Sequence, residues 1–372
     1  IDDVYGKSVT CEICELVDKP KENPTQAYTL NTKNKEEYAK VAEQINEDEA
    51  VKLVHIQHEF GLFGGNYGDH LLDFLNVIKK PVTFTFHSVI PNPNNELKTF
   101  VKLLLSYSNS VFVMTNQSEE ILIRDYGIEK ETITCVPHGT HVVVYDLPHN
   151  AKEKFNIQDR LVLSTFGLLG EGKNIETGLK ALTKIAKNTP NVLYLIIGRT
   201  HPNLVIDGVD TYREKLEKMV DDLNLRNHVQ FINQYLDTDQ LLEYLTATDI
   251  YMFTSKDPNQ AVSGTFSYAM SCACPIVASK IPHTVEVLSS DSGILVDIGN
   301  EDQFAEAAIK LLSDENLREE MGKNAFRKTR ASSWENVAIA HMNTYQKLFD
   351  DETEVEYSYP SIQLNHVKKM TT

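Results

Sequence analysis

Strand-length apolar runs alternate with helix-length amphipathic stretches along this chain from one end to the other. This alternation predicts parallel sheets with helices on both faces. A polar segment at 147–160 interrupts the pattern, so we expect two doubly wound α/β domains. The strand-like runs lie at 53–59, 81–87, 110–115, 132–138, 161–167 and 192–198, followed by VQFIN, DIYMFTS, PIVAS and GILVDIG.

Length and charge agree with two domains and exclude some partners. The 372 residues suit two domains of about 100 to 200 residues each. With 36 Lys+Arg against 53 Asp+Glu, the formal net charge is −17, which repels nucleic acids and anionic membrane surfaces. No apolar run approaches the roughly 18 residues of a membrane span. We therefore expect a globular protein with no nucleic-acid partner and no strong membrane association.

The five cysteines predict neither a disulfide framework nor a metal site. The sequence opens without a signal-peptide pattern, so we expect a reducing, cytoplasmic compartment. Cys11 and Cys14 form a CxxC, and Cys272 and Cys274 form a CxC. Both pairs lie in apolar segments, and the second lacks the usual zinc spacing, which favours small buried thiols.

Two candidate sites follow strands of the first half. In open parallel sheets, ligands bind beyond the carboxyl ends of the strands. QHEFGLFGGNYG (57–68) places Gly64 and Gly65 just after a strand, where they permit close approach of the backbone to a ligand; a flexible turn is the alternative. His87 ends the next strand and could donate to a sugar hydroxyl or a phosphate, or serve only the structure.

FGLLGEGKN (166–174) is a glycine-rich loop that joins a strand to a helix and carries Lys173. It is not a Walker loop, because Asn174 stands where Ser or Thr is required. Flanked by Gly167 and Gly170, Lys173 is a candidate diphosphate ligand. A solvated lysine at a helix start is the alternative.

QAVSGTFSYAMSCACPIVA (260–278) predicts a loop, a helix and a strand without a single charged residue. A helix N-terminus can hold an anion through its free backbone N–H groups. Carboxylates would compete with that anion, and the hydroxyls of Ser263 and Thr265 could add donors. An ordinary helix capped by Ser263 is the alternative.

In this order, four strings resemble the family 4 retaining glycosyltransferases of the GT-B fold. They are QHEFGLFGG (57–65), PHG (137–139), FGLLGEGK (166–173) and SGTFSYAMSCACP (263–275). The resemblance covers about residues 40–350 and implies two Rossmann-like domains that face each other across a cleft.

The resemblance also implies a domain organisation. An acceptor-side domain would span 1–145, with a final helix at about 335–350 packing back on it. A nucleotide-sugar donor domain would span 158–334. The tail 351–372 resembles a linker to a further helical domain.

The resemblance implies transfer of a hexose, first of all mannose, from GDP-mannose or a UDP-sugar to a saccharide or another hydroxyl acceptor. No metal or other cofactor is expected, and the configuration of the sugar would be retained. The catalytic residues would be His87, Lys173 and Gln260. Donor-binding residues would be Gly64, Gly65, Gly167, Gly170, Lys173, Arg199, Ser263, Gly264, Thr265, Tyr268 and Glu286.

Three positions depart from the family pattern. Gln260 and Tyr268 stand eight positions apart where the family has two carboxylates, and Leu168 stands where many relatives have an arginine. Lys173 and the helix amides would then hold the diphosphate alone. Two other interpretations stay open: a non-catalytic module that binds nucleotide sugars, and a GT-B nucleotide-sugar epimerase or hydrolase.

Overall fold

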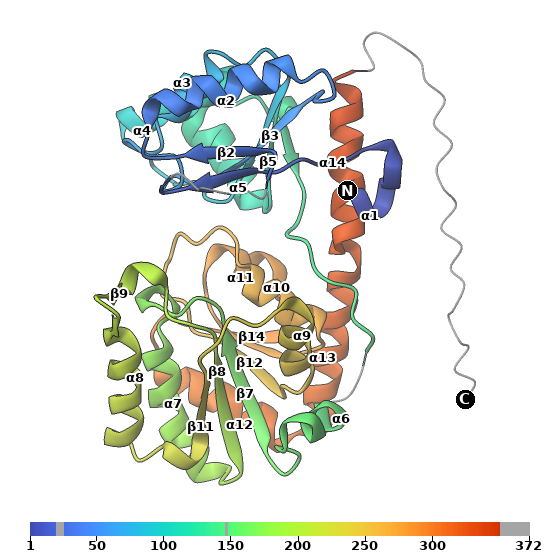
Figure 1. The fold of residues 1–372 in the computed structure, drawn as a ribbon. Helices are drawn as coiled ribbons and strands as arrows, with labels where there is room; N and C mark the ends of the chain where they lie inside the picture. Colours follow the sequence, from blue (N-terminus) through green and yellow to red (C-terminus); the bar gives the residue numbers. More distant parts are fainter. Residues whose placement is uncertain (20–25, 146–147, 350–372) are drawn as a thin grey trace, which may run out of the picture.

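The computed structural model describes residues 1–19, 26–145 and 148–349. Two sheet-centred domains lie one above the other, and two chain crossings join them along one side (Figure 1). The predicted tail at 351–372 lies outside the described residues. In the described part, no helix is long and apolar enough to cross a membrane.

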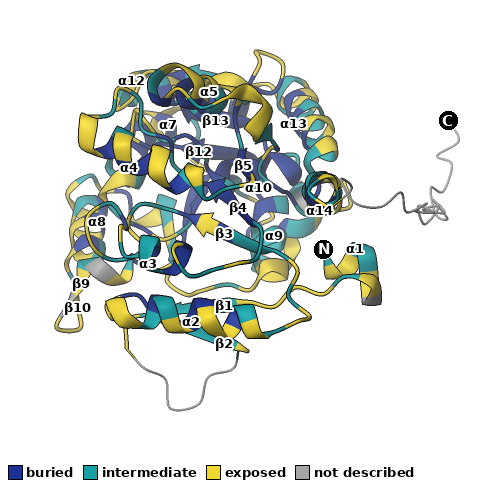
Figure 2. Cartoon of the chain, turned by 90° about the horizontal axis from the view of Figure 1, so that it is seen from above, coloured by how far each residue is buried: buried dark blue, intermediate teal, exposed yellow. Residues whose placement is uncertain are grey.

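The first domain is built on a four-stranded parallel sheet in the order β3-β4-β5-β6, with a separate parallel pair β1-β2. Figure 2 shows strands β4 and β5 dark between helices whose outer faces are exposed. The strands are β1 (Cys14–Val17), β2 (Tyr28–Asn31), β3 (Val54–His58), β4 (Val82–Phe86), β5 (Ser110–Val113) and β6 (Ile133–Cys135). The helices are α1 (Asp2–Tyr5), α2 (Lys35–Glu47), α3 (Leu71–Leu75), α4 (Asn95–Ser106) and α5 (Asn116–Ile121).

The second domain is built on a six-stranded parallel sheet in the order β11-β8-β7-β12-β13-β14, and a short antiparallel hairpin β9-β10 lies beside it. Its strands are β7 (Leu161–Phe166), β8 (Val192–Ile197), β9 (Val205–Ile206), β10 (Val209–Asp210), β11 (Val229–Ile232), β12 (Ile250–Phe253), β13 (Ile276–Ser279) and β14 (Gly293–Val296). Its helices are α6 (Pro148–Lys152), α7 (Ile175–Asn188), α8 (Thr211–Asp222), α9 (Thr238–Thr246), α10 (Gly264–Ser271), α11 (Pro282–Val287), α12 (Glu301–Ser313) and α13 (Glu315–Thr329).

The last described helix, α14 (Trp334–Lys347), returns to the first domain, as Figure 1 shows. Its Val337, Met342 and Tyr345 pack with Phe112 of β5 and Val136. The chain therefore crosses between the domains twice, once after β6 and once before α14.

The two crossings are hydrogen-bonded to each other. The Thr140 amide donates to the Ser332 carbonyl at 2.8 Å, and the Trp334 amide donates to the Thr140 carbonyl at 3.0 Å. Trp334 lies where a side chain on Gly139 would be, so only glycine fits beside this ring. The glycine of PHG thus serves the junction between the domains.

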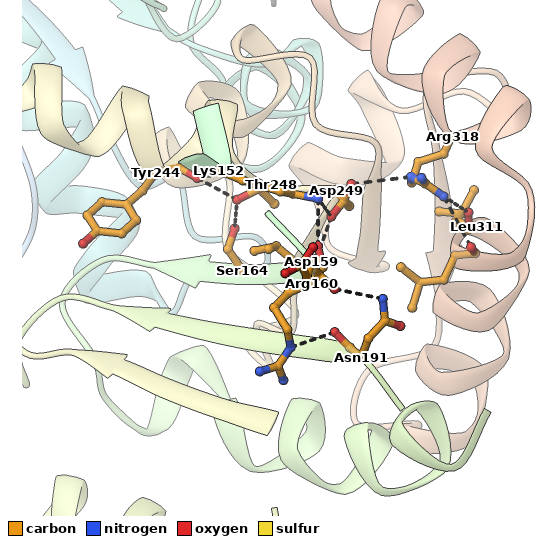
Figure 3. A network of polar contacts seen from close by, with 12 residues as sticks. Lys152, Asp159, Arg160, Ser164, Asn191, Tyr244, Thr248, Asp249, Leu311 and Arg318 are labelled. Carbon is orange, nitrogen blue, oxygen red and sulfur yellow. Dashed lines mark hydrogen bonds and ion pairs between the residues drawn. The ribbon is translucent and has the colours of Figure 1, made fainter. Parts of the chain in front are cut away.

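A buried ion pair ties the first crossing to the second domain (Figure 3). Lys152 of α6 binds Asp249 at 2.6 Å, and both side chains are about 5% exposed. Asp249 also accepts from the Val162 amide at 2.6 Å, and Arg318 lies 3.8 Å from its other oxygen. Because α6 belongs to this network, we place the start of the second domain near residue 148 rather than 158.

Two elements of the first domain differ from the sequence prediction. The amphipathic pattern of 68–79 predicts one helix over these residues, but the structure has only α3, which cannot begin at Gly68 because that residue has φ +89°. The pair β2 and α2 comes from a region for which the pattern predicted no element. Strand β2 is short, so its alternation is too brief to stand out.

Candidate active site

A cavity of about 660 Å³ lies between the two domains. The second domain contributes three loops to it, those after β7, β8 and β12. The first domain and its crossing contribute Glu59, His87, Ser88 and His138. The second domain contributes Leu168, Gly170, Glu171, Gly172, Lys173, His201, Leu204, Ser255, Asp257, Asn259, Gln260, Ala261, Val262 and Gly264.

Lys173 is positioned by a short 3₁₀ turn, Glu171–Lys173, at the end of the β7 loop. The Lys173 carbonyl accepts from the Thr254 hydroxyl at 2.7 Å, and the Gly172 carbonyl accepts from the Lys256 amide at 3.0 Å. These bonds tie the turn to the loop after β12. The glycine-rich loop at 166–174 is therefore held in place by hydrogen bonds to the loop after β12.

The Lys173 ammonium group lies 3.4 Å from the Thr265 hydroxyl and has no ion-pair partner in the described part of the chain. Burial lowers the pKa of Lys173 to about 8. The side chain passes close to Gly167, where a Cβ would lie 3.3 Å from Lys173 Cε. A partly buried cation without a counterion is a group that an incoming anion would stabilise.

The start of α10 faces the same cavity. The Ser263 hydroxyl makes no capping bond and lies 3.0 Å from the Thr265 hydroxyl, so the ordinary Ser-capped helix is not what the structure shows. The Ser263 amide donates to His283 Nδ1 at 2.9 Å and is not available to a ligand, contrary to the sequence expectation. Burial holds the pKa of His283 at about 3, which keeps this nitrogen an acceptor. The amides of Gly264 and Thr265 are left at the helix start.

His138 stands over that helix start. A Cβ on Gly264 would lie 2.8 Å from His138 Nε2, so glycine is required where the ring approaches the helix. His138 Nδ1 lies 2.8 Å from the Gly139 carbonyl. His138 belongs to the PHG string but is not among the site residues predicted from the sequence. Its place directly after β6, at the carboxyl end of a strand, is the signal that could have identified it.

His87 and Glu59 form the opposite wall of the cavity. His87 Nε2 lies 2.6 Å from the Gln57 side-chain oxygen. Because an amide oxygen only accepts, Nε2 is the donor, which leaves Nδ1 as an acceptor for a sugar hydroxyl rather than the donor expected from sequence. The Ser88 hydroxyl donates to Glu59 at 2.7 Å. Burial lowers the pKa of His87, so it is neutral near pH 7.

Gln260 lines the cavity, but its side chain is bonded to its own loop. Its oxygen accepts from the Ser255 hydroxyl at 2.7 Å, and its nitrogen donates to the Val262 carbonyl at 3.1 Å. In this structure Gln260 braces the loop that leads into α10. Any contact with a sugar would require one of these bonds to be exchanged.

Several predicted donor-binding residues lie outside the cavity lining. Gly64 and Gly65 have positive φ and pack against His70, so they shape a turn of the first domain. Arg199 is exposed. Tyr268 points its ring at His138 and His141, with centroid distances of 6.0 and 4.9 Å, and packs at the domain junction.

Glu286 reaches across the domain boundary. Its carboxylate accepts from the Asn116 amide at 2.8 Å, the Asn116 side chain at 2.9 Å and the Gln117 amide at 3.1 Å. These donors are the start of α5 in the first domain. Glu286 therefore links the two domains by hydrogen bonds and does not line the cavity.

The cysteine pairs lie in different domains and all five thiols are free. Cys272 and Cys274 are buried, and burial raises the pKa of Cys272 to about 12. In residues 1–19, 26–145 and 148–349, no group of three or more His, Cys, Asp or Glu could hold a metal ion.

Comparison with known proteins relates part of this chain to a glycosyltransferase family. Residues 149–328 match the family model of the glycosyl transferases group 1. The matched residues include Lys173, Gln260 and the start of α10.

Larger parts of the chain are also similar to individual glycosyltransferases. It is 22% identical over 328 residues to N-acetylgalactosamine-N,N'-diacetylbacillosaminyl-diphospho-undecaprenol 4-alpha-N-acetylgalactosaminyltransferase of Campylobacter jejuni, covering 87% of this chain and 82% of that protein. It is 23% identical over 276 residues to an uncharacterized glycosyltransferase of Methanocaldococcus jannaschii, covering 74% and 62%. A D-inositol 3-phosphate glycosyltransferase of Xylanimonas cellulosilytica is matched over 58% of its length. The match thus covers less than two thirds of the last two relatives.

Two solved structures share the fold. HepE of Anabaena, solved in complex with UDP, superposes with a TM-score of 0.67 at 18% identity, covering 84% of this chain and 82% of HepE. Sucrose-phosphate synthase of Thermosynechococcus elongatus superposes with a TM-score of 0.70 at 21% identity, covering 85% and 78%. The fold is GT-B, and glycosyl transfer is the enzyme class that these comparisons support.

Proposed function

We propose that this chain is a retaining glycosyltransferase that moves a hexose from a nucleoside diphosphate sugar to an acceptor hydroxyl without a metal ion. One observation carries the proposal. Lys173, which is partly buried and has no ion-pair partner among the described residues, and the uncapped start of α10 face one interdomain cavity, and His87 of the other domain lines that cavity too. This is an anion site with room for a sugar beside it.

The chemistry needs negative charge to be stabilised on the leaving diphosphate as the glycosidic bond breaks. Lys173 and the amides of Gly264 and Thr265 would supply fixed positive charge at that point. Such groups speed the reaction only if they bind the transition state more tightly than the ground state. Losing one preorganised donor typically costs about 100-fold or more in turnover.

The sugar would lie between the diphosphate site and the first domain. His87 Nδ1 would accept from a sugar hydroxyl, since Nε2 is used by Gln57. Gln260 would exchange its bond to Ser255 or Val262 for a bond to the sugar. The acceptor would enter along Glu59 and Ser88.

The donor would be GDP-mannose or a UDP-sugar. HepE has been solved with UDP and with UDP-glucose, which makes a UDP-hexose a candidate to test beside GDP-mannose. The acceptor would be a saccharide or another compound with a free hydroxyl.

A second candidate is a non-catalytic module that binds nucleotide sugars. The neutral Gln260 and Tyr268 favour it, because Gln260 is bonded within its loop and Tyr268 packs at the domain junction.

The first experiment is thermal unfolding of the purified chain with UDP, GDP and a panel of their hexose conjugates. A ligand at about 100 times its dissociation constant adds roughly 2.7 kcal/mol of stability. The stabilising donor is then incubated with a panel of saccharides, and the products are analysed with and without each acceptor. Glycoside formation supports the transferase, binding without turnover supports the module, and stabilisation by none of the nucleotides contradicts both.

A further inference from the structure

We propose that His138 is a ligand of the donor diphosphate and binds it in the protonated form, so that donor binding takes up a proton. The inference rests on the proposed function, because it assumes a nucleoside diphosphate at the start of α10. It adds to Lys173 a second cationic group, supplied by the crossing between the domains and not by the donor domain itself.

The geometry brings His138 to the diphosphate site. The edge of its ring formed by Nε2 and Cε1 faces Gly264, at 2.8 and 2.9 Å from where a Cβ would lie. Both residues line the interdomain cavity. An anion bound by the Gly264 amide would therefore meet Nε2 of His138.

The hydrogen bond on the far side of the ring fixes which form of His138 can bind. Nδ1 lies 2.8 Å from the Gly139 carbonyl, and a carbonyl can only accept, so the Nδ1 proton is committed there. In the neutral ring, Nε2 then carries a lone pair, which repels a phosphate oxygen. Only the imidazolium presents an Nε2–H to the diphosphate. In the described part of the chain, no residue forms a hydrogen bond with Nε2.

The surroundings keep His138 neutral until an anion arrives. Burial lowers its pKa, the bond to Gly139 raises it, and the nearby His87 lowers it further. A charge on His138 would also be repelled by a charge on the nearby His283. The rings of Tyr268 and Trp334 pack against the His138 ring. No described carboxylate forms an ion pair with His138. The incoming diphosphate is thus the group that would stabilise its charge.

The pH range separates His138 from Lys173. The free His138 has a pKa below the usual 6.5, and a bound anion raises it, so the extra affinity appears as pH falls toward and below 6.5. Lys173, with a pKa of about 8, is already charged in that range. Its contribution is lost only as pH rises through about 8.

The test is isothermal titration calorimetry of GDP and of UDP against wild type and His138→Gln at about pH 6 and about pH 7.5. A hydrogen bond to a charged group is worth roughly tenfold or more in affinity, so we expect His138→Gln to bind about tenfold more weakly near pH 6. Near pH 7.5 the difference should shrink to about twofold. Because each comparison is made at one pH, titration of the nucleotide itself cancels.

A second measurement follows the protons that are taken up when the nucleotide binds. In buffers with different heats of ionisation, wild type should take up protons on binding near pH 6.5. His138→Gln should take up fewer, whereas the matched control His228→Gln, a histidine of the second domain outside the cavity lining, should behave as wild type does.

Equal affinities and equal proton uptake for wild type and His138→Gln would overturn this inference while leaving the proposed function intact. Failure of wild type to bind GDP or UDP at any pH would instead overturn the proposed function, and the inference with it.

Discussion

The ammonium nitrogen of Lys173 lies 3.4 Å from the hydroxyl of Thr265, although 92 positions separate the two residues in the chain. One ends the loop after β7, and the other is the second residue of α10. Their approach joins the glycine-rich loop and the uncharged helix start into one anion site. It also explains why residues 260–278 of this acidic chain include no carboxylate. A carboxylate there would pair with Lys173 and occupy the anion site.

Lys173→Met should weaken binding of GDP or UDP by about 10-fold to 100-fold, because a bond to a charged group is lost. Turnover should fall by at least about 100-fold. Calorimetry gives the first value and nucleotide release from the donor gives the second. The chain should stay folded, because Lys173 has no ion pair to lose in the described structure. Turnover close to that of wild type would show that Lys173 has no part in the reaction.

The pH dependence of binding gives Lys173 an independent test. Since burial lowers its pKa to about 8, the ammonium charge is lost as pH rises through that value. Wild-type affinity for GDP or UDP should therefore decline between about pH 7 and pH 9, and Lys173→Met should show no such decline. A wild-type affinity that stays constant over this range would mean that the bound anion does not sense this charge.

His87→Ala should lower the rate of sugar transfer while leaving the affinity for the bare nucleoside diphosphate nearly unchanged. The reason is position: His87 belongs to the first domain, across the cavity from Lys173. The comparison is between turnover of the nucleotide sugar and calorimetry with GDP or UDP. Equal turnover for the variant and wild type would return His87 to a purely structural role beside Gln57.

Asp249→Ala should destabilise the second domain by about 3 to 5 kcal/mol, because it leaves the buried Lys152 without its ion-pair partner. Urea unfolding monitored by circular dichroism measures this. The matched control is Asp222→Ala, which breaks the exposed pair with Lys218 and should have little measurable effect. Similar midpoints for the two variants would show that the Lys152–Asp249 pair does not anchor the crossing.

His58→Leu should stabilise the protein by about 1 to 3 kcal/mol near pH 7. His58 is fully buried, both ring nitrogens lack a partner among the residues that the structure describes, and its neighbours include Phe63 and Phe86. An apolar side chain removes the cost of those unpaired polar atoms. Urea unfolding of both proteins gives the difference, and a less stable variant would contradict the stated cost.

The same variant should unfold less readily in mild acid. Burial lowers the pKa of His58 to about 4, so the folded state binds fewer protons than the unfolded state below about pH 6.5. Stability is therefore lost as pH falls toward 4, and His58→Leu should lose less of it than wild type does.

Much of the architecture could be predicted from the sequence, because the period of the apolar residues records which elements are buried. The strands from 161–167 onward lie where the pattern placed them, since each is a short apolar run between polar segments. Lys173 was predicted as a site residue from its glycines, and the structure brings it to the cavity. The uncharged stretch after Gln260 predicted a helix start, and α10 begins at Gly264.

The rest depends on contacts between distant segments, which local pattern does not record. Nothing near Glu286 in the chain reveals that it binds the start of α5. Likewise, nothing near Ser263 in the chain reveals that its amide donates a hydrogen bond to His283. Gly65 follows a strand, as a ligand-binding glycine would, yet its positive φ serves a turn packed on His70. His138 was missed because its role comes from the approach to Gly264, 126 positions further along the sequence.

The most direct measurement is a crystal structure of the chain soaked with UDP or GDP. We expect the diphosphate between the Lys173 ammonium group and the amides of Gly264 and Thr265, within hydrogen-bond distance of both. A nucleotide bound elsewhere, with this helix start still unoccupied, would contradict the proposed anion site and the function built on it.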